Sequence, residues 1–205
     1  MKQKDYDYNI FINCPFDRTY ARMFNAIVFT ITHCGFYVRC ALEEPDSSEN
    51  RLLRILNIIS ECKYSIHDIS RQEIDTSTQL PRFNMPLELG IFLGAKSFGK
   101  QYHKDKKCLI LDKEPYRYRQ SVSDIAGLDI EYHNGSIKKA IVCVRNWLAN
   151  TSGSKRLYSG SFIYQHYLQF QKELPKICNQ NNLDARGLTF LEHNSLANAW
   201  CIQTI

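Results

Sequence analysis

Glu88 is the residue of this sequence with the strongest pattern for chemistry. It is the single acid in residues 87–95, a run that is otherwise apolar nearly all round and predicts a helix covered on most sides. Asn84 is the expected N-cap and Pro86 suits the first turn, so Glu88 is expected in that turn, near the positive end of the helix dipole. A lone carboxylate there suits chemistry at a ribose. The alternative is an acid that only stabilises the helix.

Asp68 is the second candidate, because it ends a predicted strand at residues 63–68. An acid at the carboxyl end of a central parallel strand points toward the place where such sheets bind ligands. A turn or capping role is the alternative. Asp17 follows the first predicted strand, and it is expected either to cap the next helix or to contact a ligand.

Cations and aromatic residues flank the same positions. Arg82 and Phe83 stand just before the Glu88 helix, where a cation beside an aromatic ring can hold a phosphate or stack on a base. A surface arginine and a phenylalanine covering the core are the alternative. The segment 116–119, with two tyrosines and two arginines, is either a nucleotide contact or a lid or oligomer surface.

Strand and helix patterns alternate along the chain and must position these residues. The predicted strands span residues 8–14, 36–42, 63–68, 107–112 and 128–132. The predicted helices span residues 18–34, 51–62, 85–95, 136–149, 161–179 and 187–201. This alternation predicts an α/β fold with a five-stranded parallel, flavodoxin-like sheet of order 2-1-3-4-5. The site is then defined by the loops at residues 14–18, 43–49, 68–84 and 113–124, beyond the carboxyl ends of the strands.

The chain divides into an α/β domain at residues 1–150 and a linker with a C-terminal helical hairpin at residues 151–205. The linker, residues 151–160, is rich in Ser and Gly. The hairpin is too small to fold alone, so it is expected to pack on the main domain or on another subunit. Its aromatic residues make it a candidate docking surface for a homo-oligomer or a partner protein.

Composition excludes several classes of function. The net charge of +5 comes from 26 basic and 21 acidic residues that are interspersed, so no specific nucleic-acid binding is expected. The eight cysteines form no C-x-x-C pair and no His/Cys cluster at zinc spacing, which predicts reduced thiols, a cytoplasmic protein and no metal site. No apolar run approaches the roughly 20 residues of a membrane span, and the N-terminus does not resemble a signal peptide.

Three stretches together resemble a known family. Asn13-Cys-Pro-Phe-Asp17, Asp68-Ile-Ser70 and the run from Asn84 to Ala95 are similar to the nucleoside 2-deoxyribosyltransferase group and to the related TIR-type NAD-cleaving domains of bacterial defence systems. The resemblance covers residues 8–148. It departs from the family where Asn84-Met-Pro86 replaces the usual Gly-Thr pair of the transferases, and where the Ser-x-Trp-Cys lead-in of TIR domains is absent.

The resemblance implies a site as well as a fold. Glu88 would act at the anomeric carbon and Asp68 would orient the sugar or the base. The substrate-binding residues that it implies are Cys14, Pro15, Phe16, Asp17, Ser70, Arg82, Phe83, Asn84 and Met85.

The first hypothesis is therefore cleavage of an N-glycosidic bond in NAD, a nucleotide or a nucleoside, by an antiphage effector that assembly activates. The nicotinamide of NAD is already cationic and leaves without protonation, so one carboxylate can suffice. NAD would be a substrate, and no cofactor is expected. The second hypothesis is a nucleotide-sensing module with the same pocket and no catalysis. The third is a structural subunit whose pocket is filled by its own segment 116–119.

Overall fold

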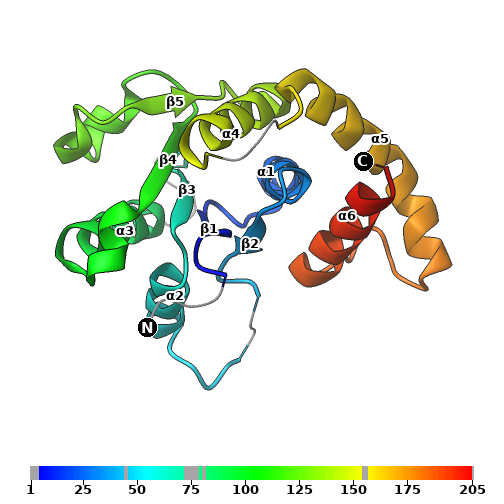
Figure 1. Ribbon diagram of the computed structural model, residues 1–205, viewed down its shortest axis with the longest axis horizontal. Coiled ribbons are helices and arrows are strands. Elements are labelled where there is room, and N and C mark those ends of the chain that lie inside the picture. Colours follow the sequence, from blue (N-terminus) through cyan, green and yellow to red (C-terminus); the bar gives the residue numbers. More distant parts are fainter. Residues whose placement is uncertain (1–4, 44–45, 72–78, 80–81, 154–156, 205) are drawn as a thin grey trace.

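The computed structural model describes the chain except residues 1–4, 44–45, 72–78, 80–81, 154–156 and 205. Five parallel strands form one sheet in the order β2-β1-β3-β4-β5, as the sequence predicts (Figure 1). The strands are β1 (Asn9–Asn13), β2 (Tyr37–Arg39), β3 (Tyr64–Asp68), β4 (Lys107–Asp112) and β5 (Ile130–Tyr132). The two edge strands, β2 and β5, have three residues each, so β2 is shorter than the predicted residues 36–42.

The described residues form six α-helices. They are α1 (Ala21–His33), α2 (Arg51–Ser60), α3 (Asn84–Phe98), α4 (Ile137–Thr151), α5 (Gly160–Gln180) and α6 (Phe190–Thr204). Of these, α1 to α4 pack on the two faces of this sheet, while α5 and α6 pack on α1 and α4. Figure 1 shows α1, α4, α5 and α6 on one side of the sheet, with α2 and α3 on the other. Short 3₁₀ helices occupy Gln101–Asp105, Arg117–Gln120 and Ser123–Ile125. None of the helices in the described part of the chain is both long and apolar enough to cross a bilayer.

The two helical layers have separate cores because successive side chains of a strand point to opposite faces of the sheet. Ile10 and Ile12 of β1 face the layer of α1, α4, α5 and α6. Phe29 of α1 lies fully buried in that layer, with ring centroids 5.3 Å from Phe170 of α5 and 5.8 Å from Trp200 of α6. The C-terminal helices therefore pack on the α/β domain of their own chain. Phe11 of β1 faces α2 and α3 instead.

The helix α1 ends as predicted but starts later. Gly35 has φ +80°, its N–H donates to the carbonyl of Thr32, and the N–H of Phe36 donates to the carbonyl of Ile31. These are the two bonds of a Schellman motif, in which glycine adopts the left-handed conformation at little cost. The prediction that the helix starts at residue 18 is wrong, because residues 18–20 form a turn before Ala21. Asp17 caps that turn.

The helix α3 differs from its prediction in three respects. Asn84 is the first residue of the helix rather than its N-cap. The N-cap position is taken by Phe83, which makes no side-chain cap bond. Pro86 lies in the first turn as expected, but Glu88 lies in the second turn. The run 87–95 is not covered on most sides, since only Glu88, Leu89 and Phe92 in it are buried and Leu87 is 57% exposed. Phe98, at the end of the helix, is 91% exposed. An all-round apolar composition here does not mean all-round burial.

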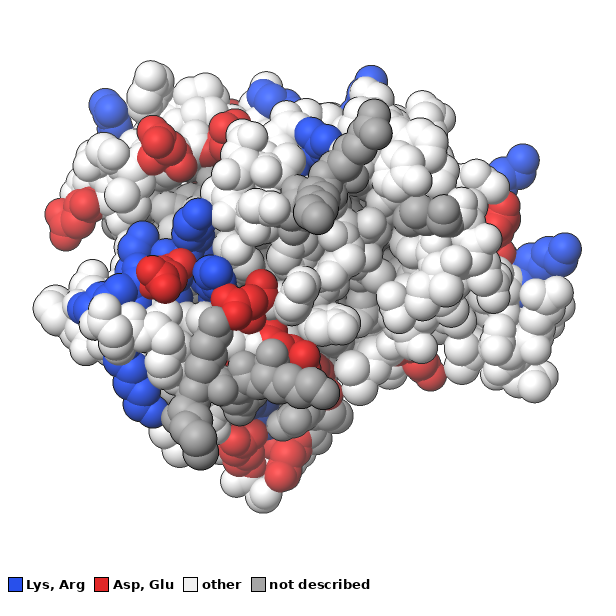
Figure 2. Space-filling view, in the orientation of Figure 1, with Lys and Arg blue, Asp and Glu red and all other residues white. Residues whose placement is uncertain are grey.

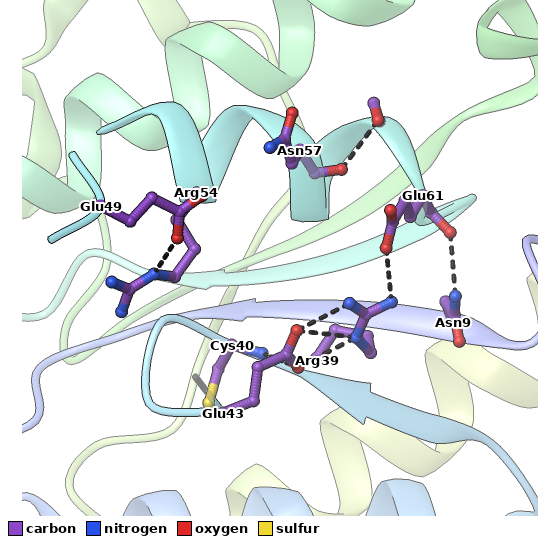
Figure 3. Close-up of polar contacts among 9 residues, drawn as sticks. Asn9, Arg39, Cys40, Glu43, Glu49, Arg54, Asn57 and Glu61 are labelled. Atoms are coloured by element: carbon purple, nitrogen blue, oxygen red, sulfur yellow. Dashed lines mark hydrogen bonds and ion pairs between the residues drawn. The ribbon is translucent and has the colours of Figure 1, made fainter. Parts of the chain in front are cut away.

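Polar contacts attach α2 and the loop after β2 to the sheet (Figure 3). The guanidinium of Arg39, on β2, lies 2.7 Å from the Glu43 carboxylate and 2.9 Å from that of Glu61, beyond the end of α2. The side chain of Asn9 donates to the carbonyl of Glu61 at 3.0 Å. Farther along the loop, the Arg54 side chain lies 2.8 Å from the Glu49 carboxylate. The Glu61 contacts therefore hold the end of α2 beside β2 and the first residue of β1, and the Arg54–Glu49 pair ties the start of α2 to the loop before it.

A buried lysine also contacts the C-terminal end of α2. Lys106 is fully buried, and its Nζ donates to the carbonyl oxygens of Ile59, at 2.6 Å, and of Cys62. The same Nζ lies 4.8 Å from the ring centroid of Phe92 and 5.3 Å from that of Tyr6. The amine therefore satisfies two carbonyls at the end of a helix and contacts two aromatic faces.

Asn50 is the N-cap of α2, and its side chain bonds to the first turn of that helix. Removing this side chain should lower the stability of the protein by a measurable amount. The Asn50 Oδ1 accepts from the backbone N–H of Leu52 at 2.9 Å and from that of Leu53 at 3.3 Å. We expect Asn50→Ala to lower the free energy of unfolding by about 1 kcal/mol, measured by urea denaturation. Asn57→Ala, an exposed position inside the same helix, is the control and should cost nothing, because alanine favours helix. Equal losses in both variants would contradict the cap.

Candidate functional site at the carboxyl ends of the strands

Four polar residues meet where the strands end. Asn13 ends β1, Asp68 ends β3, Asp112 ends β4, and His133 follows β5 directly. All four are buried, and both aspartates have no exposed surface at all. Polar side chains at such positions need partners, since burying an unpaired charge is costly. Their partners therefore define what this edge of the sheet can do.

The carboxylate of Asp68 is held by groups from three other segments. The Tyr20 hydroxyl donates to Oδ2, and the N–H of Ser70 donates to Oδ1 at 2.9 Å. The His133 Nε2 lies 3.1 Å from Oδ2, and the Gly135 N–H donates to Nδ1 of that ring at 3.0 Å, which leaves the ring proton on Nε2 facing Asp68. Burial alone would raise the pKa of Asp68, but these contacts outweigh it and lower that pKa below its ordinary value. Asp68 is a fixed anion.

Asp112 forms a second, adjoining acid site. Its Oδ1 accepts from the Lys113 N–H at 2.6 Å and lies 2.9 Å from Nη2 of Arg117, which also donates to the carbonyl of Ser70. Its Oδ2 has no hydrogen-bond partner among the described residues. Burial raises the pKa of Asp112, the Arg117 contact opposes this, and the negative charge of Asp68 adds to the rise. Arg117 thus connects the loop after β4 with the loop after β3.

A cavity of about 380 Å³ opens beside the Asp68 network. It is lined by Thr19, Tyr20, Arg22, Met23, Ser70, Arg71, Lys113, His133, Gly135 and Ile137. Three of these side chains are cations that come from α1, from the loop after β3 and from the loop after β4. Its volume falls within the range of small-molecule sites, and converging cations suit a phosphate or another anion. Tyr20 and His133 join the cavity wall to Asp68, which lies behind them.

Glu88 occupies a different environment on the other side of β3. Its side chain is 7% exposed, and its ion-pair partner in the described part of the chain is Arg51, at 3.9 Å. Burial raises the pKa of Glu88 to about 7, although the charge of Arg51 opposes the rise. Glu88 is not among the residues that line the 380 Å³ cavity. The edge of the sheet therefore carries one carboxylate that stays ionised and one whose charge is balanced near neutral pH, which is a pattern typical of acid–base sites.

Asn13 positions the start of α3 and therefore Glu88. Its Nδ2 donates to the carbonyl of Met85 at 2.8 Å and lies 2.9 Å from Nδ1 of His67. Burial lowers the pKa of His67 to about 3, so that ring is neutral and can accept this bond. Asn84, at the start of the same helix, is exposed.

Cys14 lies within electrostatic range of both carboxylates. Burial raises the pKa of its thiol well above the ordinary value, and the negative charges of Asp68 and Glu88 add to the rise. The thiol therefore stays protonated and is unsuited to act as a nucleophile. Pro15, the next residue, is also buried.

Asp17 supports the turn that presents Tyr20 to Asp68. Its Oδ1 accepts from the N–H groups of Thr19 at 3.1 Å and of Tyr20 at 3.0 Å. Its carboxylate also lies 3.0 Å from Arg82 and 3.5 Å from Arg71. Burial would raise the pKa of Asp17, but the Thr19 and Tyr20 bonds and the two arginines lower it. Asp17 and Arg82, both predicted site residues, are thus brought together as an ion pair.

The remaining predicted residues lie farther out. Phe83 is 58% exposed, and Phe16 packs edge-to-face on Phe24 with ring centroids 5.3 Å apart. The predicted loop at residues 68–84 and the loop at 43–49 lie partly outside the described residues. In the segment 116–119, Tyr118 packs into the small core that includes Met85.

Sequence reasoning missed several residues of this edge. Asp112 and His133 occupy the ends of strands β4 and β5, so the rule that pointed to Asp68 could have found them. Tyr20, Arg22 and Arg71 carry no signal in the sequence, because only the packing of α1 against the loop after β3 brings them to one cavity. Among the described residues, no group of three or more His, Cys, Asp and Glu side chains is placed to hold a metal ion.

No family model matches the chain, and neither a curated protein nor a solved structure does. What the chain does is therefore inferred from its own residues.

Proposed function

We propose that the chain binds NAD or a related nucleotide at the carboxyl edge of the sheet and cleaves its N-glycosidic bond, with Glu88 as the reacting carboxylate. The observation that carries the proposal is the state of Glu88, a nearly buried acid with a pKa of about 7 on the helix that follows β3. Groups with pKa values shifted by burial toward neutrality concentrate at functional sites.

The proposed reaction needs few groups. The bond between the ribose C1′ and the ring nitrogen of nicotinamide breaks, and its electron pair leaves with nicotinamide. Water adds to C1′ and releases one proton, so that ADP-ribose, nicotinamide and a proton are formed. The ionised Glu88 would stabilise the positive charge that develops at C1′. The positive charge of bound nicotinamide would itself lower the pKa of Glu88 and favour the ionised form.

The other residues of the edge have supporting roles in this proposal. The three cations of the 380 Å³ cavity would hold phosphate oxygens. A ligand that spans from this cavity to Glu88 would cross the end of β1, the place where the strand order reverses and where such sheets bind dinucleotides. Asp68 has no exposed surface and would act through Tyr20 and His133, as a positioning residue.

The test is incubation with NAD, ATP and deoxyadenosine at low and high protein concentration, followed by chromatography of the products. Free nicotinamide should appear with the natural chain, and Glu88→Gln should lower its rate of release at least about 100-fold. Glu114→Gln, which changes an exposed acid, is the matched control and should keep full activity. Full recovery of intact substrates under all conditions would contradict the proposal.

A second function, nucleotide sensing without cleavage, is favoured by the separation between the cationic cavity and Glu88. A sensor would be stabilised by an intact nucleotide that it does not consume. A rise in melting temperature with NAD or ATP, abolished by Arg71→Ala and accompanied by no product, would select this function over cleavage.

A further inference from the structure

A second cavity, of about 310 Å³, lies between the start of α1 and the two C-terminal helices. Its wall includes Phe16, Phe24, Gln171, Leu174, Phe190 and His193. The lining residues come from the loops after β1 and β2, from α1, from both C-terminal helices and from the loop that joins those two helices. None of them lines the 380 Å³ cavity, so the two cavities are separate.

Two polar atoms in the wall of this cavity lack partners. Nε2 of Gln171, on α5, and Nε2 of His193, on α6, are both buried, and neither has a hydrogen-bond partner among the described residues. Leaving such groups unsatisfied costs about 1 to 3 kcal/mol each, so buried polar atoms without partners are uncommon. His193 is only 4% exposed, and both side chains line the cavity. Because neither nitrogen has exposed surface of its own, its side chain must rotate before it can donate to an acceptor that enters the cavity.

The rest of the wall is mainly apolar and uncharged. Phe24, Leu174 and Phe190 are buried hydrophobic residues, and Arg186 is the one charged side chain among the lining residues, exposed at the surface. Burial lowers the pKa of His193 to about 4, so its ring adds no charge at neutral pH. In the view of Figure 2 the surface over α5 and α6 carries few charged side chains. This wall does not suit a highly charged ligand.

We propose that this cavity is a binding site for an uncharged, mainly apolar small molecule that carries one hydrogen-bond acceptor, which the side chains of Gln171 and His193 bind. Phe16 connects this cavity with the candidate functional site at the carboxyl ends of the strands. The ring of Phe16 lines the cavity, and its neighbour Asp17 holds the turn before α1. Binding in this cavity would therefore change the environment of the loop that positions Tyr20 against Asp68. This inference does not depend on the proposed reaction.

Two probes of nearly equal shape test the site. Acetanilide has an aromatic ring and a carbonyl acceptor, whereas propylbenzene has the ring without an acceptor. Titration of each into the full chain with labelled leucine methyl groups should shift the signals of Leu174 and Leu188 in NMR spectra. Acetanilide should also shift the backbone amide signal of Phe16.

Variants then separate the specific site from unspecific contact. Gln171→Leu should weaken acetanilide binding about fivefold, the equivalent of one hydrogen bond, and leave propylbenzene unchanged. Gln165→Leu, at an exposed position of the same helix, is the matched control and should affect neither probe. Ala185→Phe should fill the cavity and abolish binding of both. The proposal is overturned if acetanilide shifts none of these signals, or if Gln171→Leu and Gln165→Leu act alike.

Discussion

Replacing Glu88 by Gln is expected to make the protein gain stability over the natural chain by about 2 to 3 kcal/mol between pH 5 and pH 8. The folded pKa of Glu88 is about 7, against an ordinary value of 4.5. Below pH 4.5 the acid is protonated in both states and has no effect. Between pH 4.5 and 7 it ionises in the unfolded chain first, so the stability of the natural chain falls as the pH rises. The glutamine cannot ionise and escapes this loss.

Urea denaturation at pH 5 and at pH 8 measures the difference in the free energy of unfolding between Glu88→Gln and the natural chain. The pKa shift of 7 − 4.5 = 2.5 units corresponds to between about 3 and 4 kcal/mol at most, since one unit is worth about 1.4 kcal/mol. Glu114→Gln should differ from the natural chain by the same small amount at both values, because Glu114 is exposed. If the stability difference between Glu88→Gln and the natural chain is the same at both pH values, Glu88 is solvated or paired. Its proposed role in catalysis would then lose its basis.

The second large effect is expected at Asp68. Asp68→Ala should lower the free energy of unfolding by about 3 to 5 kcal/mol at pH 7, as the loss of one partner from a buried charged network does. The variant leaves the Tyr20 hydroxyl and the Ser70 N–H without their acceptor and removes the carboxylate that lies 3.1 Å from His133 Nε2. Because the folded pKa of Asp68 is lowered, its contribution is complete above the unfolded pKa and is lost as the pH falls through the folded pKa.

A double-mutant cycle isolates the central contact of that network. In a Tyr20→Phe background the cost of Asp68→Ala should shrink by about 1 kcal/mol or more, because the hydroxyl is no longer left unpaired. Asp129→Ala, at an exposed acid, is the control and should change stability by less than about 0.5 kcal/mol. Additive effects of Tyr20→Phe and Asp68→Ala would contradict the contact.

The arrangement of strands and helices could be predicted because the burial of each element leaves a pattern of apolar residues in the sequence. The run from Asn9 to Asn13 is buried on both faces, and such strands read as continuous apolar segments. Element ends were less accurate where a turn precedes a helix, as at Asp17. The exposure of Leu87 and Phe98 could not be predicted, because an apolar residue carries no information about which neighbour covers it.

The candidate site could be predicted in part, because the predicted strands fix where their carboxyl ends lie. A strand end in a parallel sheet has a known position, so Asp68 could be singled out before its surroundings were known. Arg22, Arg71 and Lys113 could not, since exposed cations are common and only tertiary packing brings these three to one cavity. The shifted pKa of Glu88 likewise follows from its surroundings and not from its neighbours in sequence.

The burial of Lys106 has a consequence for chemical labelling. Its amine donates to Ile59 and Cys62 and has no exposed surface, so an acylating reagent cannot reach it in the folded protein. Modification at this position requires the last turn of α2 to separate from the sheet. The rate of Lys106 acylation, followed by mass spectrometry, therefore measures how often the last turn of α2 separates from the sheet. This measurement needs neither a ligand nor an activity assay.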